Sequence, residues 1–324
     1  MRFALMIEPQ QGLSYDEQVA IVQRAEKVGF ESFFRSDHYQ SFPGPSGEPT
    51  TDAWAVLAGL ARETTTIGLG TLVTPITFRS FGNLAKVATT VDEMSGGRLE
   101  FGLGAGWNDV EHRQLGLPFP DIKERADMLE EQFAVLHGLW GEPDGWSFHG
   151  EHVTIEGAQF HPKPVDRPGR ARFANGAVRP RLLAGSEGSP RSFRIAARYV
   201  DEYNLSSASP DTARTKFAEL RAVCEASGRD PASMGRSVMS GVLIGRNDAE
   251  VERRKRDLLA AFGDEEGGDA WFTTRERRWV IGTPDQARAM VARFEDAGAE
   301  RLMLQDFIPR DLDMIDAIAE ALFG

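Results

Sequence analysis

The side chains in this sequence that could move protons lie just after two short apolar runs near the N-terminus. Glu8 follows the run over residues 3–7, and Asp37 and His38 follow a second run over residues 32–34. A histidine beside an acid can act as a proton donor or base, or can hydrogen-bond to a heteroaromatic ring. Adjacent residues need not face each other, so Asp37 and His38 are separate candidates. A structural or surface histidine is the alternative interpretation of His38.

Two glycine-rich segments could hold a ligand. The first, from Gly102 to Trp107, has the spacing G-x-G-x-G and lacks the third glycine of a dinucleotide-binding loop. Its small residues instead predict that the backbone approaches a flat ligand closely. The second, from Gly185 to Ser189, precedes a helix that we expect to begin at Pro190. Because a helix N-terminus attracts anions, this segment is a candidate phosphate site, or else a plain glycine-rich turn. Glu187 must point away from a phosphate bound there.

Metal and serine-hydrolase chemistry find little support in the sequence. His149 and His152, with His161 downstream, lie where no helix is expected to place the first two on one face, so we expect no metal site. The glycine-serine run at 185–188 has the wrong spacing for a nucleophile elbow. The single cysteine, Cys224, cannot form an intramolecular disulfide.

Short β-like runs alternate with amphipathic helical segments along the chain. The expected strands cover residues 3–7, 32–34, 67–73, 99–103, 181–184, 202–205, 237–244 and 301–305. The expected helices include residues 52–63, 81–94, 123–140, 211–226, 249–261, 284–297 and 312–322, and others begin at start signals near Ser14 and Pro190. Eight strands, each followed by a helix, predict an α/β fold in which a parallel sheet closes into a (β/α)8 TIM barrel. An open doubly wound sheet is the structural alternative.

Two long stretches interrupt this alternation, after the fourth and seventh βα units. Residues 141–180 are rich in Gly, Pro, His and Arg, with a possible hairpin, and residues 262–281 are charged and glycine-rich. Long loops in a barrel are often lids or binding loops. Within the first stretch, Arg170, Arg172 and Arg179 could meet an anionic cofactor tail or could be solvated. We expect residues 1–324 to form a single barrel domain that carries both insertions.

The composition disfavours several classes of partner. Among 324 residues, 49 acidic and 37 basic side chains give a formal net charge of −12, which repels nucleic acid and anionic membranes. The apolar start of the chain reaches Glu8 after five apolar residues, too few for a signal peptide or a transmembrane helix. We therefore expect a cytoplasmic protein with a small-molecule substrate and with neither nucleic acid nor membrane as a partner.

The strand-end motifs together resemble the bacterial luciferase-like monooxygenase superfamily and, within it, the branch that uses the deazaflavin coenzyme F420. The resemblance covers residues 3–322 and depends on the order and spacing of the motifs. These are Ser36-Asp37-His38, Gly70 to Pro75, Gly102-x-Gly104-x-Gly106-Trp107-x-x-x-Glu111, Gly185-Ser186-x-Gly188, Ala196-Ala197-x-x-x-Asp201-x-x-Asn204 and Gly282-Thr283-Pro284. The F420 branch depends mainly on the first motif and on Gly106-Trp107.

The resemblance implies a role for each candidate residue. His38 would lie beside the deazaflavin ring with Asp37 as support, and Glu8 would lie on the substrate side, so these three are the expected catalytic residues. A bulge with a non-prolyl cis peptide bond is expected after the third strand. Residues 185–189 would receive the cofactor phosphate. The expected cofactor contacts are Leu72, Val73, Thr74, Gly106, Trp107, Asn108, Gly185, Ser186, Glu187, Gly188 and Ser189.

The implied function is an oxidoreductase that transfers a hydride between F420 and a small organic substrate. The alternative is a monooxygenase on the same barrel that uses reduced FMN (FMNH2) from a separate reductase. A third interpretation, from another class, is a non-catalytic relative that binds flavin. The chain has only six lysines, none placed as in sugar-phosphate-oxidising relatives, so a sugar phosphate is disfavoured as the substrate. The substrate itself is not identified, and a possible homodimer is an expectation from relatives alone.

Overall fold

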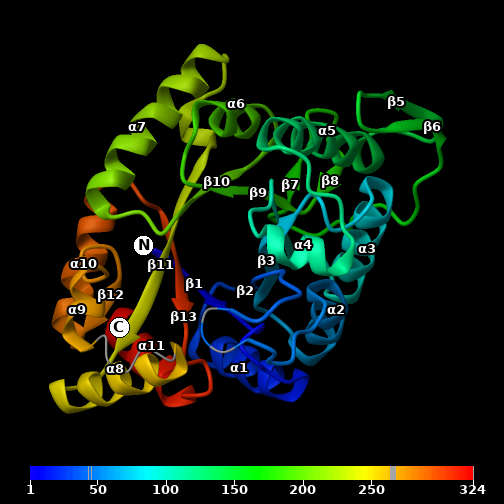
Figure 1. The fold of residues 1–324 in the computed structure, drawn as a ribbon. Coiled ribbons are helices and arrows are strands. Elements are labelled where there is room, and N and C mark those ends of the chain that lie inside the picture. The colour runs from blue at the N-terminus through cyan, green and yellow to red at the C-terminus, as the bar shows by residue number, and fades with distance from the viewer. Residues whose placement is uncertain (43, 45, 263–267, 324) are drawn as a thin grey trace.

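Eight parallel strands close into a barrel in the computed structural model of this chain (Figure 1). The structure describes residues 1–42, 44, 46–262 and 268–323. β1 pairs with its neighbours on both edges, and so does every other barrel strand, which closes the sheet. The predicted (β/α)8 barrel is therefore confirmed, and the doubly wound alternative is wrong. Around the barrel, the strands are β1 (Arg2–Ile7), β2 (Ser32–Arg35), β3 (Gly68–Pro75), β4 (Leu99–Gly104), β9 (Arg181–Ser186), β10 (Glu202–Ser206), β11 (Gly235–Ile244) and β13 (Arg301–Asp306).

Helices form the outer layer of the barrel. They are α1 (Tyr15–Val28), α2 (Ala53–Glu63), α3 (Phe81–Met94), α4 (Asp109–Leu115), α5 (Ile122–Gly141), α6 (Pro190–Tyr199), α7 (Pro210–Ala226), α8 (Asp248–Phe262), α9 (Gly268–Thr273), α10 (Pro284–Asp296) and α11 (Leu312–Leu322). The helix ends predicted for 81–94 and 312–322 match the structure, the other predicted helix bounds agree within one residue, and the predicted strand bounds agree within two. Capping residues determine many of these ends. At the start of α1, for example, Ser14 and Glu17 form a capping box. Within the described residues, no helix combines the length and apolar composition needed to cross a membrane.

The two predicted insertions carry small elements beside the barrel. Residues 141–180 contain the antiparallel pairs β5 (Trp146–His149) with β6 (Thr154–Ala158) and β7 (Ala171–Arg172) with β8 (Val178–Arg179), so the expected hairpin is confirmed. Before β11 lies a single 3₁₀ turn, Pro231–Ser233. In the second insertion, β12 (Val280–Gly282) pairs with the end of β11, and residues 263–267 lie outside the described residues.

Alternation along the strands separates the barrel interior from the helix layer. On β1, Leu5 and Ile7 pack with the helices, whereas Ala4 and Met6 belong to a small apolar cluster inside the barrel. Below this cluster, the fully buried side chain of Arg301, at the start of β13, fills the amino end of the barrel, and Figure 1 shows β13 beside β1 and β11. The carboxyl ends of the strands lie on the other side of this cluster, and barrel enzymes carry their active sites at that end.

Carboxylates from two other strands neutralise Arg301. Its Nη1 lies 2.8 Å from Glu100 Oε2 and 3.6 Å from Glu202 Oε2; Arg301 and Glu202 are fully buried, and the Glu100 side chain is 13% exposed. The proximity of these acids holds the pKa of Arg301 above its usual range, and Arg301 lowers the pKa of Glu100 despite the burial of that carboxyl. This ion cluster ties β4, β10 and β13 together at the closed end.

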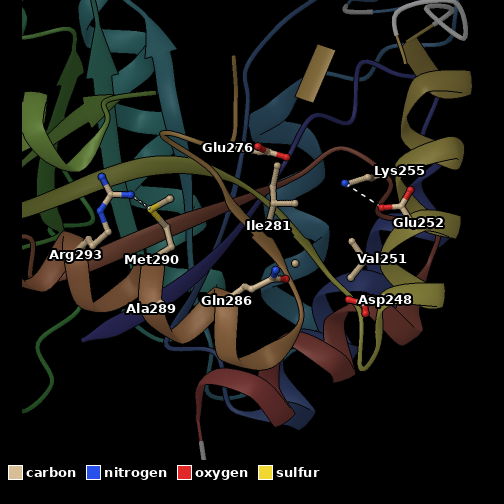
Figure 2. Close-up of a pocket in the computed structure, with 11 residues that line it drawn as sticks. Asp248, Val251, Glu252, Lys255, Glu276, Ile281, Gln286, Ala289, Met290 and Arg293 are labelled. Atoms are coloured by element: carbon tan, nitrogen blue, oxygen red, sulfur yellow. Dashed lines mark hydrogen bonds and ion pairs between the residues drawn. The ribbon is translucent and has the colours of Figure 1, made fainter. Parts of the chain in front are cut away.

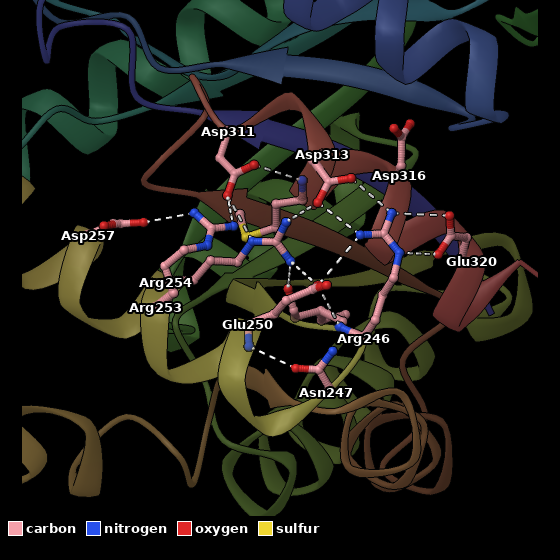
Figure 3. Close-up of polar contacts among 12 residues, drawn as sticks. Arg246, Asn247, Glu250, Arg253, Arg254, Asp257, Asp311, Asp313, Asp316 and Glu320 are labelled. Atoms are coloured by element: carbon pink, nitrogen blue, oxygen red, sulfur yellow. Dashed lines mark hydrogen bonds and ion pairs between the residues drawn. The ribbon is translucent and has the colours of Figure 1, made fainter.

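A second network of ion pairs joins α8 to the loop between β13 and α11 (Figure 3). The fully buried Arg254 donates to Asp311 at 2.9 Å, to Asp313 at 2.8 Å and to the carbonyl of Ile244 at 2.6 Å. Arg246 reaches Asp313 from the other side at 2.9 Å. The loop after β13 therefore has a fixed position beside the carboxyl end of the barrel.

Candidate functional site

His38 is held by a carboxylate that the sequence analysis did not pair with it. Its Nδ1 lies 2.9 Å from Glu111 Oε1, and the Tyr39 backbone N–H donates to Glu111 Oε2 at 2.9 Å. Because a carboxylate accepts hydrogen bonds, Nδ1 donates, and Nε2 remains for a ligand. Glu111 is only 1% exposed and comes from α4, a helix that the sequence did not predict. The quoted motif contains Glu111, yet only the closed fold brings the two residues together.

An exposed aromatic wall stands next to His38. The Trp107 indole is 65% exposed, the largest exposure among the large apolar side chains of the described residues. Its ring lies edge-on to His38 at 5.7 Å and to Phe42 at 5.3 Å between centroids. Asn108 follows and caps α4, because its side chain accepts from the Val110 N–H at 3.1 Å. Trp107 therefore offers a surface against which a planar ring can pack.

Asp37 faces away from His38, as the sequence left open, and forms an ion pair with Arg79. Arg79 Nη1 lies 2.7 Å from Asp37 Oδ2, which also accepts from the Thr74 hydroxyl at 2.9 Å. Arg79 further contacts Asp52 and the Tyr39 hydroxyl. Asp37 is 1% exposed. Asp37 therefore supports the loop that carries His38. Its partner Arg79 is a site residue that the sequence did not indicate.

Glu8 enters the barrel mouth between two glutamines. Gln10 Nε2 donates to Glu8 Oε2 at 2.6 Å, and the Gln305 amide donates to Glu8 Oε1. The Ser36 hydroxyl donates to Gln10 Oε1 at 2.5 Å, which fixes the amide that holds Glu8. This cluster places carboxylate and amide groups just after β1 and near the end of β13. It suits a substrate with its own hydrogen-bond donors and acceptors.

The third barrel strand carries the expected bulge. The register between β3 and β4 shifts between Thr71 and Thr74, and the peptide bond Leu72–Val73 is cis. Thr74 is fully buried and accepts from the Trp54 indole at 3.0 Å, so its hydroxyl supports the loop from behind. Leu72 belongs to the apolar cluster inside the barrel, and Val73 packs against it.

The glycines of β4 and β9 make room for this bulge. A Cβ at Gly102 would lie 2.2 Å from the Thr71 carbonyl oxygen, and one at Gly104 would lie 2.6 Å from Val73 Cγ2. A Cβ at Gly185 would lie 3.1 Å from Val73 Cγ1. The G-x-G spacing therefore accommodates a neighbouring strand, and the interpretation that Gly102 and Gly104 admit a flat ligand is wrong. Gly106 is different, because its φ of +77° is a conformation that favours glycine.

Hydroxyl groups gather at the N-terminus of α6, where a phosphate site was predicted. Tyr203 lies 2.5 Å from the Ser186 hydroxyl and 2.7 Å from the Ser192 hydroxyl. Ser189 caps α6 and accepts from the Ser192 N–H at 3.1 Å, and Gly188 N–H donates to Ser186 at 3.1 Å. Burial raises the pKa of Tyr203, so its hydroxyl keeps its proton.

The residues at this turn fit a phosphate group. The three serine hydroxyls can rotate to donate, the buried Tyr203 supports them from behind, and the helix N-terminus adds favourable dipole charge. Glu187 is exposed, as the phosphate interpretation requires. Sequence reasoning missed Tyr203 because an aromatic residue in an apolar strand indicates core packing.

The basic segment of the first insertion does not reach the barrel mouth. Arg170 pairs with Asp92 at 2.7 Å, Arg172 pairs with Asp166 at 2.6 Å, and Arg179 pairs with Asp201. Asp92 lies on α3 near its C-terminal end, and Asp201 precedes β10, so these contacts lie at the amino end of the barrel. The expectation that these arginines meet an anionic cofactor tail is therefore wrong.

A separate hollow of about 430 Å³ lies between α8 and α10 (Figure 2). Val251 and Lys255 of α8 and Met290 and Arg293 of α10 line it. Because it is lined by helices and by β12, and not by the ends of the barrel strands, it is distinct from the candidate site. Within the described residues, no group of three or more His, Cys, Asp or Glu side chains is placed to hold a metal ion.

The fold is a (β/α)8 barrel whose polar side chains gather at the carboxyl ends of the strands, the end at which barrel enzymes carry their sites. Residues 1–301 match the family model described as luciferase-like monooxygenase, and the chain belongs to this family. It is 31% identical over 274 residues to pyrimidine monooxygenase RutA of Stutzerimonas stutzeri (strain A1501), covering 82% of this chain and 70% of that one.

Two solved structures show the same fold. An F420-dependent secondary alcohol dehydrogenase, in complex with an F420-acetone adduct, has a TM-score of 0.81 and 21% identity, with 99% of this chain and 98% of that chain covered. The monooxygenase RslO1 from Streptomyces bottropensis has a TM-score of 0.81 and 20% identity, with 100% and 99% covered. At these identities the similarity shows the fold alone, and the fold is shared by F420 enzymes and monooxygenases.

Proposed function

We propose that this chain is a monooxygenase that uses reduced FMN from a separate reductase and acts on a small planar substrate with an amide-like edge. The observation that carries the proposal is the 31% identity, over 82% of the chain, to a protein named as a pyrimidine monooxygenase. This places the alternative of the sequence analysis ahead of F420-dependent hydride transfer.

The residues of the site divide into cofactor and substrate groups. The hydroxyls of Ser186 and Ser189 would hold the FMN phosphate, with the buried Tyr203 fixing that of Ser186, and Trp107 would pack against the ring. When bound, reduced FMN supplies two electrons, so that one oxygen atom of O₂ enters the substrate and the other leaves as water. Glu8 and the amides beside it would bind the substrate edge.

His38 has the position to handle a proton in this reaction. Glu111 fixes Nδ1–H, and Nε2 can then donate to or accept from a group in the mouth. Because Glu111 also accepts from the Tyr39 backbone, the imidazole has one preferred orientation before any ligand binds. Such preorganisation contributes to catalysis since no reorientation is needed during the reaction.

Hydride transfer with F420 is the second candidate function. The observation that favours it is the segment Ser36-Asp37-His38 together with Trp107, which the structure brings to within 5.7 Å of His38 between ring centroids. The same His38–Glu111 pair would then serve the transfer of a proton that accompanies the hydride. A deazaflavin does not react readily with oxygen, so the two candidates differ in their need for O₂.

Cofactor binding separates the two candidates directly. Apoprotein is titrated with FMN and, separately, with F420, and binding is followed by fluorescence. Reduced FMN with the pyrimidines uracil and thymine is then tested for product in air, in argon and in ¹⁸O₂. Saturable FMN binding with ¹⁸O in the product supports the monooxygenase. Saturable F420 binding, with O₂-independent oxidation or reduction of alcohols, ketones or enones, would replace it with the second candidate.

Two histidine variants test the role of the site residue. His38→Ala should lower turnover by at least tenfold with a smaller effect on cofactor affinity, because one acid–base group contributes about 10²–10⁴-fold. His149→Ala is the matched control, since His149 is an exposed histidine on β5. Equal turnover of the two variants would remove His38 from the mechanism.

A further inference from the structure

The outer face of α6 carries three arginines at helical spacing. Arg191, Arg194 and Arg198 stand at positions i, i+3 and i+7, which share one face of a helix. The opposite face packs into the core through Phe193 and Ala196.

Two of these arginines have acidic partners on α5, and the third has none. Arg191 pairs with Asp127, and Arg198 Nη1 lies 3.2 Å from Glu130 Oε1. Arg194, between them and exposed, makes no hydrogen bond or ion pair within the described residues. Three cations against two carboxylates leave one positive charge unbalanced on this face.

The arginines line a hollow of about 740 Å³ between α5, α6 and the end of α7. Ile195 and Ala197 contribute an apolar floor, and Ser227 contributes a hydroxyl. The guanidinium group is the side chain best suited to phosphate and carboxylate, because its planar fork donates two parallel hydrogen bonds. The apolar floor suits the carbon skeleton between anionic groups.

We propose that this hollow, the α6 arginine face, binds a small organic anion with at least two phosphate or carboxylate groups. One anionic group would take Arg194, and a second would compete with Glu130 for Arg198. The ligand could be a free metabolite. It could also be the anionic extension of a molecule bound in the barrel mouth, because α6 begins at the hydroxyl cluster of Ser189. The site does not depend on the reaction proposed above.

Binding is tested by isothermal titration calorimetry on the full chain, with inorganic diphosphate and with citrate as probes. Arg194→Gln should weaken binding of both probes at least tenfold, because charge-assisted bidentate hydrogen bonds are the strong ones. Arg256→Gln, which removes an exposed arginine from α8, should change affinity less than twofold. Arg194→Lys should recover part of the affinity, since the charge remains without the fork.

Three results would overturn the proposal. They are no saturable binding by the wild type, equal weakening by Arg194→Gln and Arg256→Gln, and full affinity in Arg194→Gln. Thermal unfolding of each variant shows that it is folded, and no turnover is needed, so failure here is separate from failure of the proposed function.

Preloading the protein identifies the source of the anion. The diphosphate titration is repeated with FMN bound, with F420 bound and with F420 that lacks its anionic tail. Loss of diphosphate binding with complete F420 alone would assign the site to the extension of a mouth-bound cofactor. Diphosphate binding that persists in all three states would assign it to a free anion. In either case Arg194 carries the interaction.

Discussion

We predict that residue 104 must be glycine because one side chain of the neighbouring strand β3, that of Val73, occupies the space that a Cβ would need. A Cβ added at Gly104 would lie 2.6 Å from Val73 Cγ2, and its next contact, the Gly185 carbonyl oxygen, is an ordinary 3.6 Å away. The backbone of Gly104 is not in the left-handed region, so alanine is conformationally acceptable there. Val73 cannot easily yield, because β-branched side chains have few χ1 rotamers and the bulge fixes its backbone. Gly104→Ala tests this contact.

The magnitude follows from the contacts. Overpacking of a well-packed interior costs about 1–3 kcal/mol, so Gly104→Ala should lower the free energy of unfolding by that amount. Val73→Ala removes both methyl groups and should itself cost about 1–2 kcal/mol. In the Val73→Ala background the obstructing Cγ2 is absent. Gly104→Ala should then change the free energy of unfolding by less than about 0.5 kcal/mol, which is a coupling characteristic of contacting residues.

Equilibrium urea unfolding, followed by tryptophan fluorescence and by circular dichroism, measures all four proteins. Gly102→Ala is the control, because its Cβ would lie 2.2 Å from the Thr71 carbonyl oxygen, a clash that Val73→Ala leaves in place although it removes the weaker 3.1 Å contact with Val73 Cγ1. It should destabilise the protein in both backgrounds. Equal destabilisation by Gly104→Ala with and without the Val73 methyl groups would refute the reasoning.

Three further predictions concern charged groups. Glu111→Gln should lower turnover about tenfold or more, because the charge-assisted hydrogen bond that it removes from His38 contributes about 1.5–3 kcal/mol. Steady-state kinetics at saturating cofactor measure this effect, and an unchanged kcat would contradict the prediction. Burial raises the pKa of Asp306 from 3.8 to about 7. Because the folded protein then holds this proton more tightly than the unfolded chain, the stability that the protonated carboxyl gives is fully present below about pH 4 and is lost as the pH rises through about 7. Asp306→Asn should therefore gain stability relative to the wild type between pH 4.5 and 8 in thermal unfolding, and a pH-independent difference would disprove the assignment. Arg254→Met should lower the free energy of unfolding in urea by about 2–4 kcal/mol, because Asp311 and the Ile244 carbonyl lose their buried partner. A decrease of less than about 0.5 kcal/mol would show that the network adds no stability.

The barrel could be predicted because its signals are local. Each strand is a short apolar run that ends in glycine or a polar residue, and each helix has capping residues near its ends. The missed elements are short: they are α4 (Asp109–Leu115), α9 (Gly268–Thr273), β12 (Val280–Gly282) and the two-residue strands β7 and β8. A segment of seven mostly polar residues has no apolar periodicity, although Asn108 before it and Gly116 after it were available as capping signals.

The site was predictable only as a set of strand ends. Residues such as His38 and Glu8 could be placed at the barrel mouth because all parallel strands end there. Their partners Glu111, Arg79 and Gln305 are distant in sequence, and no local pattern joins them. The glycines of β4 were assigned to a ligand because a sequence does not show that a bulge in the adjacent strand would occupy the same space.

The pairing of β1 with β13 has a consequence for synthesis of the chain. During translation, the edge of β1 that later accepts β13 has no partner, because β13 is the last of the barrel strands to leave the ribosome. An unpaired edge of six residues is a template for pairing with another nascent chain. Closure of the barrel must therefore follow synthesis of β13, and the yield of active protein should depend on how well chaperones shield this edge until then.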